Sequence, residues 1–298
     1  ILLLLTLHHV QCVDRVIEKR LNRLAFGSCT KVHSNVSDEI WKSIETFEPE
    51  MFAYVIVFYS RIERNLKHTP IKYRWTGDAV YAKSGSKEEL REKFMIQSEN
   101  PTYRKMAKKT IVEGVWDDHD FAKNDAGKSI FSAKERQSRQ SEYLKFLNVH
   151  PSNEERYYMR DGLYSSHLFR SSNGNVRVIF LDTRSQRDDH MIPSIAIHHW
   201  IPLSALIAAI GRWICASFGI GIEYDGDVLG ENQWKWFEKE LKESEGNDSS
   251  VIVVSSIQMY TTNPIVESWS HFPKSRDRFV NLIRTYTPSG LLNSFTHK

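Results

Sequence analysis

The sequence predicts a layered α/β fold, and two observations carry this prediction. Short apolar runs alternate with longer segments of helical periodicity, a pattern typical of sheets covered by helices. Polar residues also recur directly after the apolar runs, where the carboxyl ends of strands would lie. Ligands bind at that edge of α/β sheets because the loops there converge on one crevice. The 298 residues suffice for one large domain, or for two by length alone.

Four short, largely apolar runs are predicted to be strands, and each is followed by polar residues. They lead into Gly27-Ser28-Cys29, Asp118, Asp182-Thr183-Arg184 and Ser255-Ser256, and Trp75-Thr76 leads in the same way into Gly77-Asp78. The predicted strands are Leu24–Phe26, Ile111–Trp116, Val176–Leu181 and Val251–Val254.

Five segments have the periodicity of helices. In the fourth of them, Trp234, Phe237 and Leu241 lie at positions i, i+3 and i+7 and form one apolar stripe. Such a stripe predicts core packing rather than a cofactor site. The predicted helices are Ser37–Phe47, Lys87–Ser98, Ala133–Leu147, Glu231–Glu243 and Arg276–Arg284.

The stretch Trp116–Asp120 reads Trp-Asp-Asp-His-Asp and is the most informative motif of the chain. It places three carboxylates around one imidazole, directly after an apolar run. Neighbouring carboxylates repel one another and raise one another's pKa, so a bound cation is an effective way to keep several of them ionised. The motif therefore predicts a cation site, and a solvated acidic turn is the alternative.

Charge and cysteine content exclude several classes of protein. The chain has 40 Lys and Arg against 37 Asp and Glu, a net charge of +3, without a basic run. This argues against nucleic acid as a specific partner. The three cysteines are too few and too irregularly spaced for a disulfide framework or a zinc ribbon, although one disulfide remains open.

Two apolar regions bear on the location of the protein. Residues 1–7 are almost wholly apolar, so residues 1–20 are expected to include a secretory signal peptide that lacks its start, and a buried strand is the alternative. Residues 190–222 contain one Lys, Arg, Asp or Glu, Arg212, but also two prolines. A buried or lid-like amphipathic insertion is favoured there, with membrane association through 190–222 as the alternative. We expect a secreted protein or one in the lumen of the secretory pathway.

A hard cation in the predicted crevice would find oxygen donors on two loops. One loop follows Gly77, which permits a tight turn, and the other follows the strand at 111–116. A cysteine after the first strand would suit iron or another borderline metal. For this cysteine and for the tyrosine of the first loop, plain burial is the alternative. The candidate donors are Cys29, Asp78, Tyr81, Asp118 and Asn124.

Several short motifs follow one another along the chain. They are Phe26–Cys29, Gly77–Ala82, Trp116–Asp120 with Asn124–Gly127, Leu181–Arg184 and Gly230–Trp234. They occur in the order found in PhoD-like alkaline phosphatases, and the chain resembles this family over roughly residues 21–292. The most specific of them is the segment Asp117–Gly127, whereas Gly-Ser-Cys or Gly-Asp alone would be weak.

The resemblance implies a metallophosphoesterase-like α/β/β/α sandwich, in which two mixed sheets pack face to face between helices. It also implies a site that hydrolyses phosphate esters through metal-activated water, with iron, calcium or both as the metal. Carried over by position, the candidate donors become metal ligands, and His119 contacts the phosphate or the leaving group. Asp117 and Asp120 are expected to support these residues. Arg184 would clamp the phosphate with two hydrogen bonds or form a structural salt bridge.

The chain departs from the family pattern in three places. An insertion at about 53–74 precedes Gly77-Asp78, and Lys83 stands where the family usually has a carboxylate. After Gly290–Leu292 the family continues into a Gly-Asp-Val-His motif with further ligands, whereas this chain reads Asn293–Lys298. We therefore expect residues 21–298 to be one PhoD-like domain that is incomplete at its C-terminal end, from an incomplete or mis-spliced gene model.

Two functions follow as hypotheses. The first is a metal-dependent phosphomonoesterase or phosphodiesterase, and the second is a catalytically impaired relative that binds metal or phosphate without turnover. A third hypothesis, a hydrolase with Ser28 or Cys29 as the nucleophile and His119 as the base, is disfavoured. Its motif lacks the Gly-x-Ser-x-Gly form of a nucleophile elbow.

Overall fold

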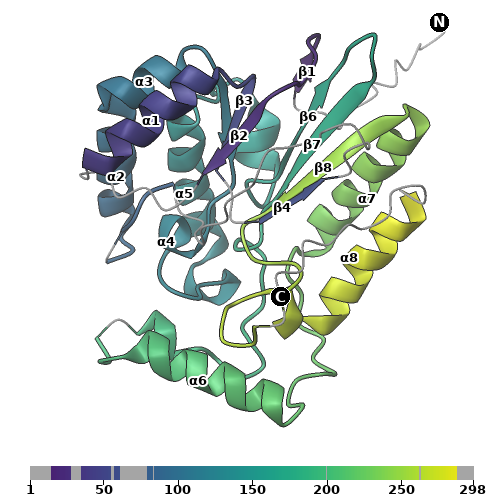
Figure 1. Cartoon of the computed structure of the whole chain (residues 1–298). Helices are drawn as coiled ribbons and strands as arrows, with labels where there is room; N and C mark the ends of the chain where they lie inside the picture. Colours follow the sequence, from purple (N-terminus) through teal and green to yellow (C-terminus); the bar gives the residue numbers. More distant parts are fainter. Residues whose placement is uncertain are drawn as a thin grey trace, which may run out of the picture.

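The computed structural model describes residues 15–27, 35–54, 57–60, 79–82, 84–198, 200–261 and 263–286. These residues form two β-sheets flanked by helices (Figure 1), which confirms the predicted fold class. The small sheet is parallel, in the order β2-β3-β5, with β2 Leu24–Gly27, β3 Met51–Tyr54 and β5 Ile111–Gly114. The large sheet is mixed, in the order β1-β6-β7-β8-β4, with β1 Arg15–Ile17, β6 Ser165–Phe169, β7 Asn175–Leu181, β8 Ser249–Ser255 and β4 Val57–Ser60.

The helices form two outer layers. Helices α1, α2, α3 and α5 lie beside the small sheet, and α7 and α8 lie beside the large one (Figure 1). Several begin at a capping side chain: Ser86 accepts from the backbone N–H of Glu89, and Ser132 from that of Glu135. The helices are α1 Asn35–Phe47, α2 Lys87–Glu99, α3 Pro101–Ala107, α4 Asp118–Phe121, α5 Ala133–Phe146, α6 Ser204–Ser217, α7 Glu231–Gly246 and α8 Pro273–Tyr286.

The central strands are buried on both faces. On β7, Val178 and Phe180 belong to a hydrophobic cluster shared with the small sheet and helices α1, α2, α3 and α5. The alternate residues, Ile179 and Leu181, belong to a second cluster under α7 and α8. Strand β8 alternates in the same way, and the apolar stripe predicted on α7 packs into the second cluster. Two-sided burial explains why these strands are nearly continuous apolar runs in the sequence.

A buried ionic cluster links the two sheets. Glu113 of β5 accepts two hydrogen bonds of 3.0 Å from the guanidinium of Arg156, and His167 Nε2 of β6 lies 2.8 Å from Glu113 Oε2. The side chains of Glu113 and Arg156 are each 4% exposed. Burial raises the pKa of Glu113, but the charges of Arg156 and His167 outweigh burial and hold this pKa well below its usual value of 4.5. The carboxylate therefore stays ionised between the sheets.

We expect the substitution Glu113→Gln to lower the free energy of unfolding by about 1.5–3 kcal/mol at neutral pH, as for hydrogen bonds to charged groups. Because the folded-state pKa of Glu113 is lowered, its stabilisation is present above pH 4.5 and is lost as the pH falls below this value. Urea unfolding of both proteins at neutral pH and at about pH 3.5 measures the effect, and the difference should shrink at the lower pH. The prediction is wrong if Glu113→Gln costs no more than Glu18→Gln, which alters an exposed pair with Arg170.

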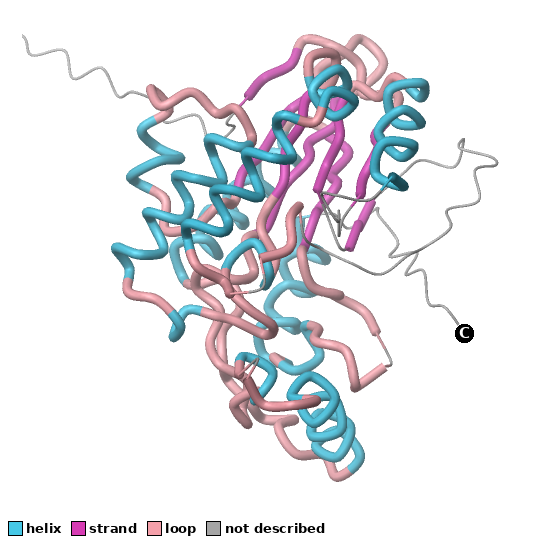
Figure 2. Tube along the Cα trace, turned by 90° about the vertical axis from the view of Figure 1, so that its left-hand side faces the viewer, coloured by secondary structure: helices cyan, strands magenta, loops and turns pink. Residues whose placement is uncertain are grey.

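The segment 190–222 is not a buried insertion. It carries α6, which stands apart from the other helices at the lower end of both views (Figures 1 and 2). The helix buries the small residues Ser204 and Ala208, and its large apolar side chains are exposed. The interpretation as a buried insertion is therefore wrong, and the lid-like amphipathic insertion stays a prediction. Among the described residues, no helix combines the length and the hydropathy that crossing a membrane requires. The exposed side chains are Leu206, Ile207, Ile210, Trp213 and Ile214.

The predicted strands and helices all occur, with bounds that differ by a few residues. Strand β6 was not predicted because it begins with Ser165, Ser166 and His167, which are polar although they are buried. Strand β4 lies within the predicted insertion at 53–74 and pairs antiparallel with β8. Residues 53–54 of that insertion end β3, whereas residues 55–56 and 61–74 lie outside the described residues. Residues 75–78 also lie outside them, as do residues 1–14 with most of the expected signal peptide.

Candidate active site

The loops at the carboxyl ends of the two sheets meet. Trp116, after β5, donates from its indole Nε1 to Asp182 Oδ2 after β7, over 2.9 Å. Arg184, two residues after Asp182, donates from its Nε to Oδ1 of Asp117, the residue after Trp116, over 2.7 Å. The polar residues that follow these strands in the sequence therefore converge, as predicted.

Asp182 acts as a structural anchor at this meeting point. Its carboxylate accepts hydrogen bonds from the backbone N–H groups of Leu163, Arg184 and Ser185, in addition to the Trp116 indole. The residue is fully buried. Its acceptor capacity is used within the protein, so we assign it to the shape of the loop rather than to a ligand.

Arg184 ties three loops together. Its guanidinium contacts Asp117 and donates two hydrogen bonds, of 3.0 and 2.7 Å, to the carboxylate of Glu267. Arg184 is 1% exposed. Burial raises the pKa of Glu267, but Arg184 and Arg187 hold it well below its usual value. Of the two interpretations of Arg184 from the sequence, these contacts match the structural salt bridge, and a contact with phosphate stays a prediction.

Asp117 shares this arginine and is also buried. Burial raises the pKa of the Asp117 carboxyl, Arg184 lowers it, and the charges of Asp118 and Glu267 raise it further. Two carboxylates thus compete for one guanidinium. Asp117 thus joins Arg184 to the start of α4, and its expected supporting role at the site stays a prediction.

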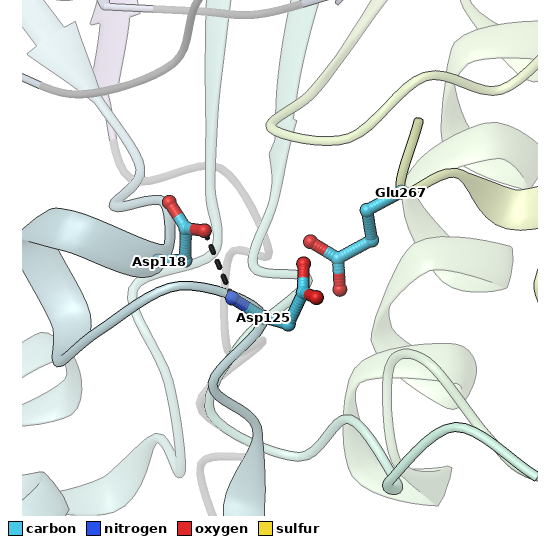
Figure 3. A group of neighbouring side chains, drawn as sticks. All are labelled: Asp118, Asp125 and Glu267. Atoms are coloured by element: carbon cyan, nitrogen blue, oxygen red, sulfur yellow. Dashed lines mark hydrogen bonds between the residues drawn. The ribbon is translucent and has the colours of Figure 1, made fainter. Parts of the chain in front are cut away.

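Three carboxylates lie close enough to hold a metal ion. One oxygen each of Asp118, Asp125 and Glu267 lies within 4.8 Å of the others, and Figure 3 shows the three side chains around one space. Asp118 comes from the first turn of α4, Asp125 from the loop after it, and Glu267 from the loop after β8. Such a set of oxygens suits a hard cation.

The charges around the three carboxylates differ. Glu267 is paired with Arg184, and Asp125 Oδ2 is 2.7 Å from Arg212 Nη1 and also accepts from the hydroxyl of Ser194. The Asp118 carboxylate accepts hydrogen bonds from two backbone N–H groups, those of His119 at 2.9 Å and Asp125 at 3.0 Å. Among the described residues, Asp118 is thus the carboxylate of the three without a guanidinium at ion-pair distance. The fit to a metal ion is good at Asp118 and poor at Glu267 and Asp125, whose charges are already balanced.

The loop of Asp125 is shaped by close backbone approach. Arg187 donates to the carbonyl of Asp125, and Lys128 N–H donates to the carbonyl of Arg187 over 2.9 Å. A Cβ at Gly127 would lie 2.7 Å from the carbonyl oxygen of Arg187, so a side chain there would clash with backbone. The Asn-Asp-Ala-Gly motif therefore needs its glycine for this contact, and Arg212 joins α6 to the same loop.

Tyr81 and His119 form a ring contact next to Asp118. Their ring centroids are 4.7 Å apart, with an angle of 43° between the planes. Both side chains are half-buried. The segment of Tyr81 is held by Asp120, whose carboxylate accepts from the N–H groups of Ala79 and Val80. The structure thus brings Tyr81 to His119, the residue after Asp118, although the two rings come from different loops.

The other predicted site residues are placed in part. Asn124 is half-buried in the loop after α4, next to Asp125. Cys29 and Asp78 lie outside the described residues, so their role as ligands stays a prediction.

Four residues of the site were missed from the sequence. Asp125 was part of a recognised motif, but Asn124 was preferred as the oxygen donor. Arg212 is the one charged residue of the segment 190–222, which was a usable signal. Arg187 lies three residues after Arg184 and outside the predicted motifs, as does Glu267. The fold brings Glu267 to Arg184, Arg187 and His190, with 3.3 Å between Glu267 and Arg187 and 3.5 Å between Glu267 and His190.

Comparison with known proteins identifies a family and a similar fold. A family model described as PhoD-like phosphatase matches residues 28–291. Among solved structures, that of PhoD is similar to this chain with a TM-score of 0.50 and 15% sequence identity. The match covers 90% of this chain and 49% of PhoD, so the chain spans about half the length of that protein. At this identity the structural match shows the fold alone. No curated protein matches the chain.

Proposed function

We propose, because this chain belongs to the PhoD-like phosphatase family, that it hydrolyses phosphate esters with the help of bound metal ions. The single observation that carries the proposal is the Asp118 carboxylate at the carboxyl edge of the sheets. It has no guanidinium at ion-pair distance among the described residues, and the next residue in the chain is His119, whose ring contacts Tyr81. The neighbouring carboxylates are balanced by arginines, so a cation would balance the charge of Asp118, whereas at the others it would compete with a guanidinium.

The residues that would hold the metal are Asp118 and Tyr81, together with Asn124, Cys29 and Asp78 as the resemblance to the family implies. Carboxylate, phenolate, amide and thiolate donors suit iron, calcium or both. The chemistry that metal ions supply in such sites is neutralisation of the phosphoryl oxygens and activation of water.

His119 would contact the phosphate or the leaving oxygen. The ring of Tyr81 packs against it and restricts its orientation, and the backbone of His119 is fixed because its N–H donates to Asp118 Oδ1. A protonated imidazole held in this way can give a proton to the leaving oxygen. We propose that Asp117 and Arg184 act indirectly, by fixing the start of α4 against the loops after β7 and β8.

Metal analysis and an ester assay on the purified chain test the proposal. We expect bound metal by mass spectrometry and hydrolysis of a nitrophenyl phosphate monoester or diester that a chelator abolishes and added iron or calcium restores. Comparing the two esters decides between a phosphomonoesterase and a phosphodiesterase. Hydrolysis that survives full removal of the metal would contradict the metal mechanism, and metal binding without hydrolysis would identify the catalytically impaired relative.

We also propose a location in the secretory pathway or outside the cell, from the apolar run at residues 1–7. Expression of the chain with a C-terminal tag, followed by fractionation of cells and medium, tests this. Recovery of the tagged chain from the cytosol alone would contradict it.

A further inference from the structure

Asp120 connects two loops that are far apart in the sequence. Its Oδ2 accepts from Ala79 N–H over 2.9 Å, and its Oδ1 accepts from Val80 N–H over 2.8 Å. A third backbone N–H, that of Asp117, lies 3.4 Å from Oδ2. Asp120 is 1% exposed, and Ala79 and Val80 are equally buried. The carboxylate is thus a buried acceptor that satisfies backbone donors of both loops.

These two loops carry the candidate site. Asp120 holds the first loop through Ala79 and Val80. This loop continues to Tyr81, whose ring contacts His119, and Ala79 is the next residue after Asp78. The loop of Asp120 itself carries Asp118 and His119. The position of the first loop relative to the second therefore depends on hydrogen bonds to one side chain, over a separation of about 40 residues.

A carboxylate is well suited to this position. It accepts hydrogen bonds at both oxygens and donates none when ionised, whereas an asparagine would place an NH2 group against one of the backbone N–H groups. Buried N–H groups that lose their acceptor are costly, so the loop would shift to regain one. A shift of a fraction of an ångström suffices to disturb a metal site.

We infer that Asp120 is a positioning residue, which holds residues 79–82 against the loop of Asp118 and His119 so that the side chains of Tyr81 and Asp118 can bind one metal site. The inference rests on the proposed function for its catalytic consequence. The hydrogen bonds themselves are independent of it. Neither of the proposed metal-binding functions requires Asp120 to contact the substrate.

Hydrogen exchange and metal titration of Asp120→Asn test the inference. The matched control is Glu240→Gln, which alters another buried carboxylate, paired with Arg177 between α7 and β7. Exchange of the amides of residues 79–82 is measured in the metal-free proteins, and the affinity for iron and calcium is measured by titration with each metal alone. Unfolding by urea reports the loss of global stability in both variants.

We expect exchange of the 79–82 amides in Asp120→Asn to rise at least about tenfold, and metal affinity to fall about 10–100-fold, as for other residues that orient metal ligands. At saturating metal, kcat should remain low. In Glu240→Gln the 79–82 amides and the metal affinity should match the wild type. Unchanged exchange and affinity in Asp120→Asn, or an equal loss in Glu240→Gln, would overturn the inference.

The wild-type protein provides a test that does not depend on the variant folding. Its metal-free form should protect the amides of Ala79 and Val80 as strongly as those of β5, because their acceptor is within the protein. Exchange of these two amides at the rate of an open loop would refute the positioning role. If the wild type hydrolyses no ester, the proposed function fails, but exchange and metal titration still decide the role of Asp120.

Discussion

Replacing Asp118 by Asn is expected to lower kcat/KM by more than about 100-fold, since mutating a residue that merely orients a metal ligand already lowers metal affinity or activity by about 10–100-fold. This corresponds to at least about 2.7 kcal/mol of lost transition-state stabilisation. The physical reason is that Asp118 is the carboxylate of the acidic group whose charge is not balanced by a guanidinium among the described residues. The two backbone N–H groups donate to different oxygens of Asp118, so asparagine keeps an acceptor for one of them, and it removes the charge that attracts a cation. Steady-state kinetics and metal content of the two proteins measure the effect.

The matched control is Asp125→Asn in the same acidic group. Asp125 is already paired with Arg212 and bonded to Ser194, so its charge is balanced without a metal. We expect this variant to retain metal close to the wild-type amount. If Asp125→Asn loses as much metal as Asp118→Asn, the whole group of Asp118, Asp125 and Glu267 is the metal site, and the distinction drawn among these carboxylates is wrong.

Replacing Arg184 by Met is expected to lower the free energy of unfolding by about 3–5 kcal/mol, the usual cost of removing one partner from a buried ion pair. Arg184 is fully buried and serves Asp117 and Glu267 together, so its loss leaves two buried carboxylates without their shared guanidinium. Urea or thermal unfolding measures the loss. The pKa of Glu267 should rise towards its usual value because the charge that lowers it most is removed.

An exposed arginine provides the control for this substitution. Arg170 lies 3.5 Å from Glu18, and its side chain is 50% exposed, so Arg170→Met should change stability by less than about 0.5 kcal/mol. The double variant Arg184→Met with Glu267→Met should recover part of the lost stability, because it removes one of the two buried carboxylates that have lost their arginine. A cost for Arg184→Met no larger than that of Arg170→Met would show that the network does not stabilise the fold.

The sequence predicted the elements of the fold better than their pairing. Strands β7 and β8 are apolar on both faces, and α7 carries one apolar stripe, so the signal was strong and local. Strand β6 starts with three polar residues, whose burial depends on partners from other elements, such as Glu113 for His167. Periodicity could not reveal it, because its polar side chains are buried by contacts that the local sequence does not contain.

For the site, the sequence by itself determined which chemical groups are present. Charged residues and a tight turn can be recognised in the acidic motif after β5, in the Asn-Asp-Ala-Gly loop and at the arginine after β7. Only the tertiary structure decided how these charges are shared. It brings Glu267, Arg187 and Arg212 to the motif, balances three carboxylates with arginines, and leaves Asp118 for a cation. The reason is physical: in a buried site the ionisation and reactivity of each carboxylate depend on charges within a few ångströms, and those charges come from parts of the chain up to about 150 residues away.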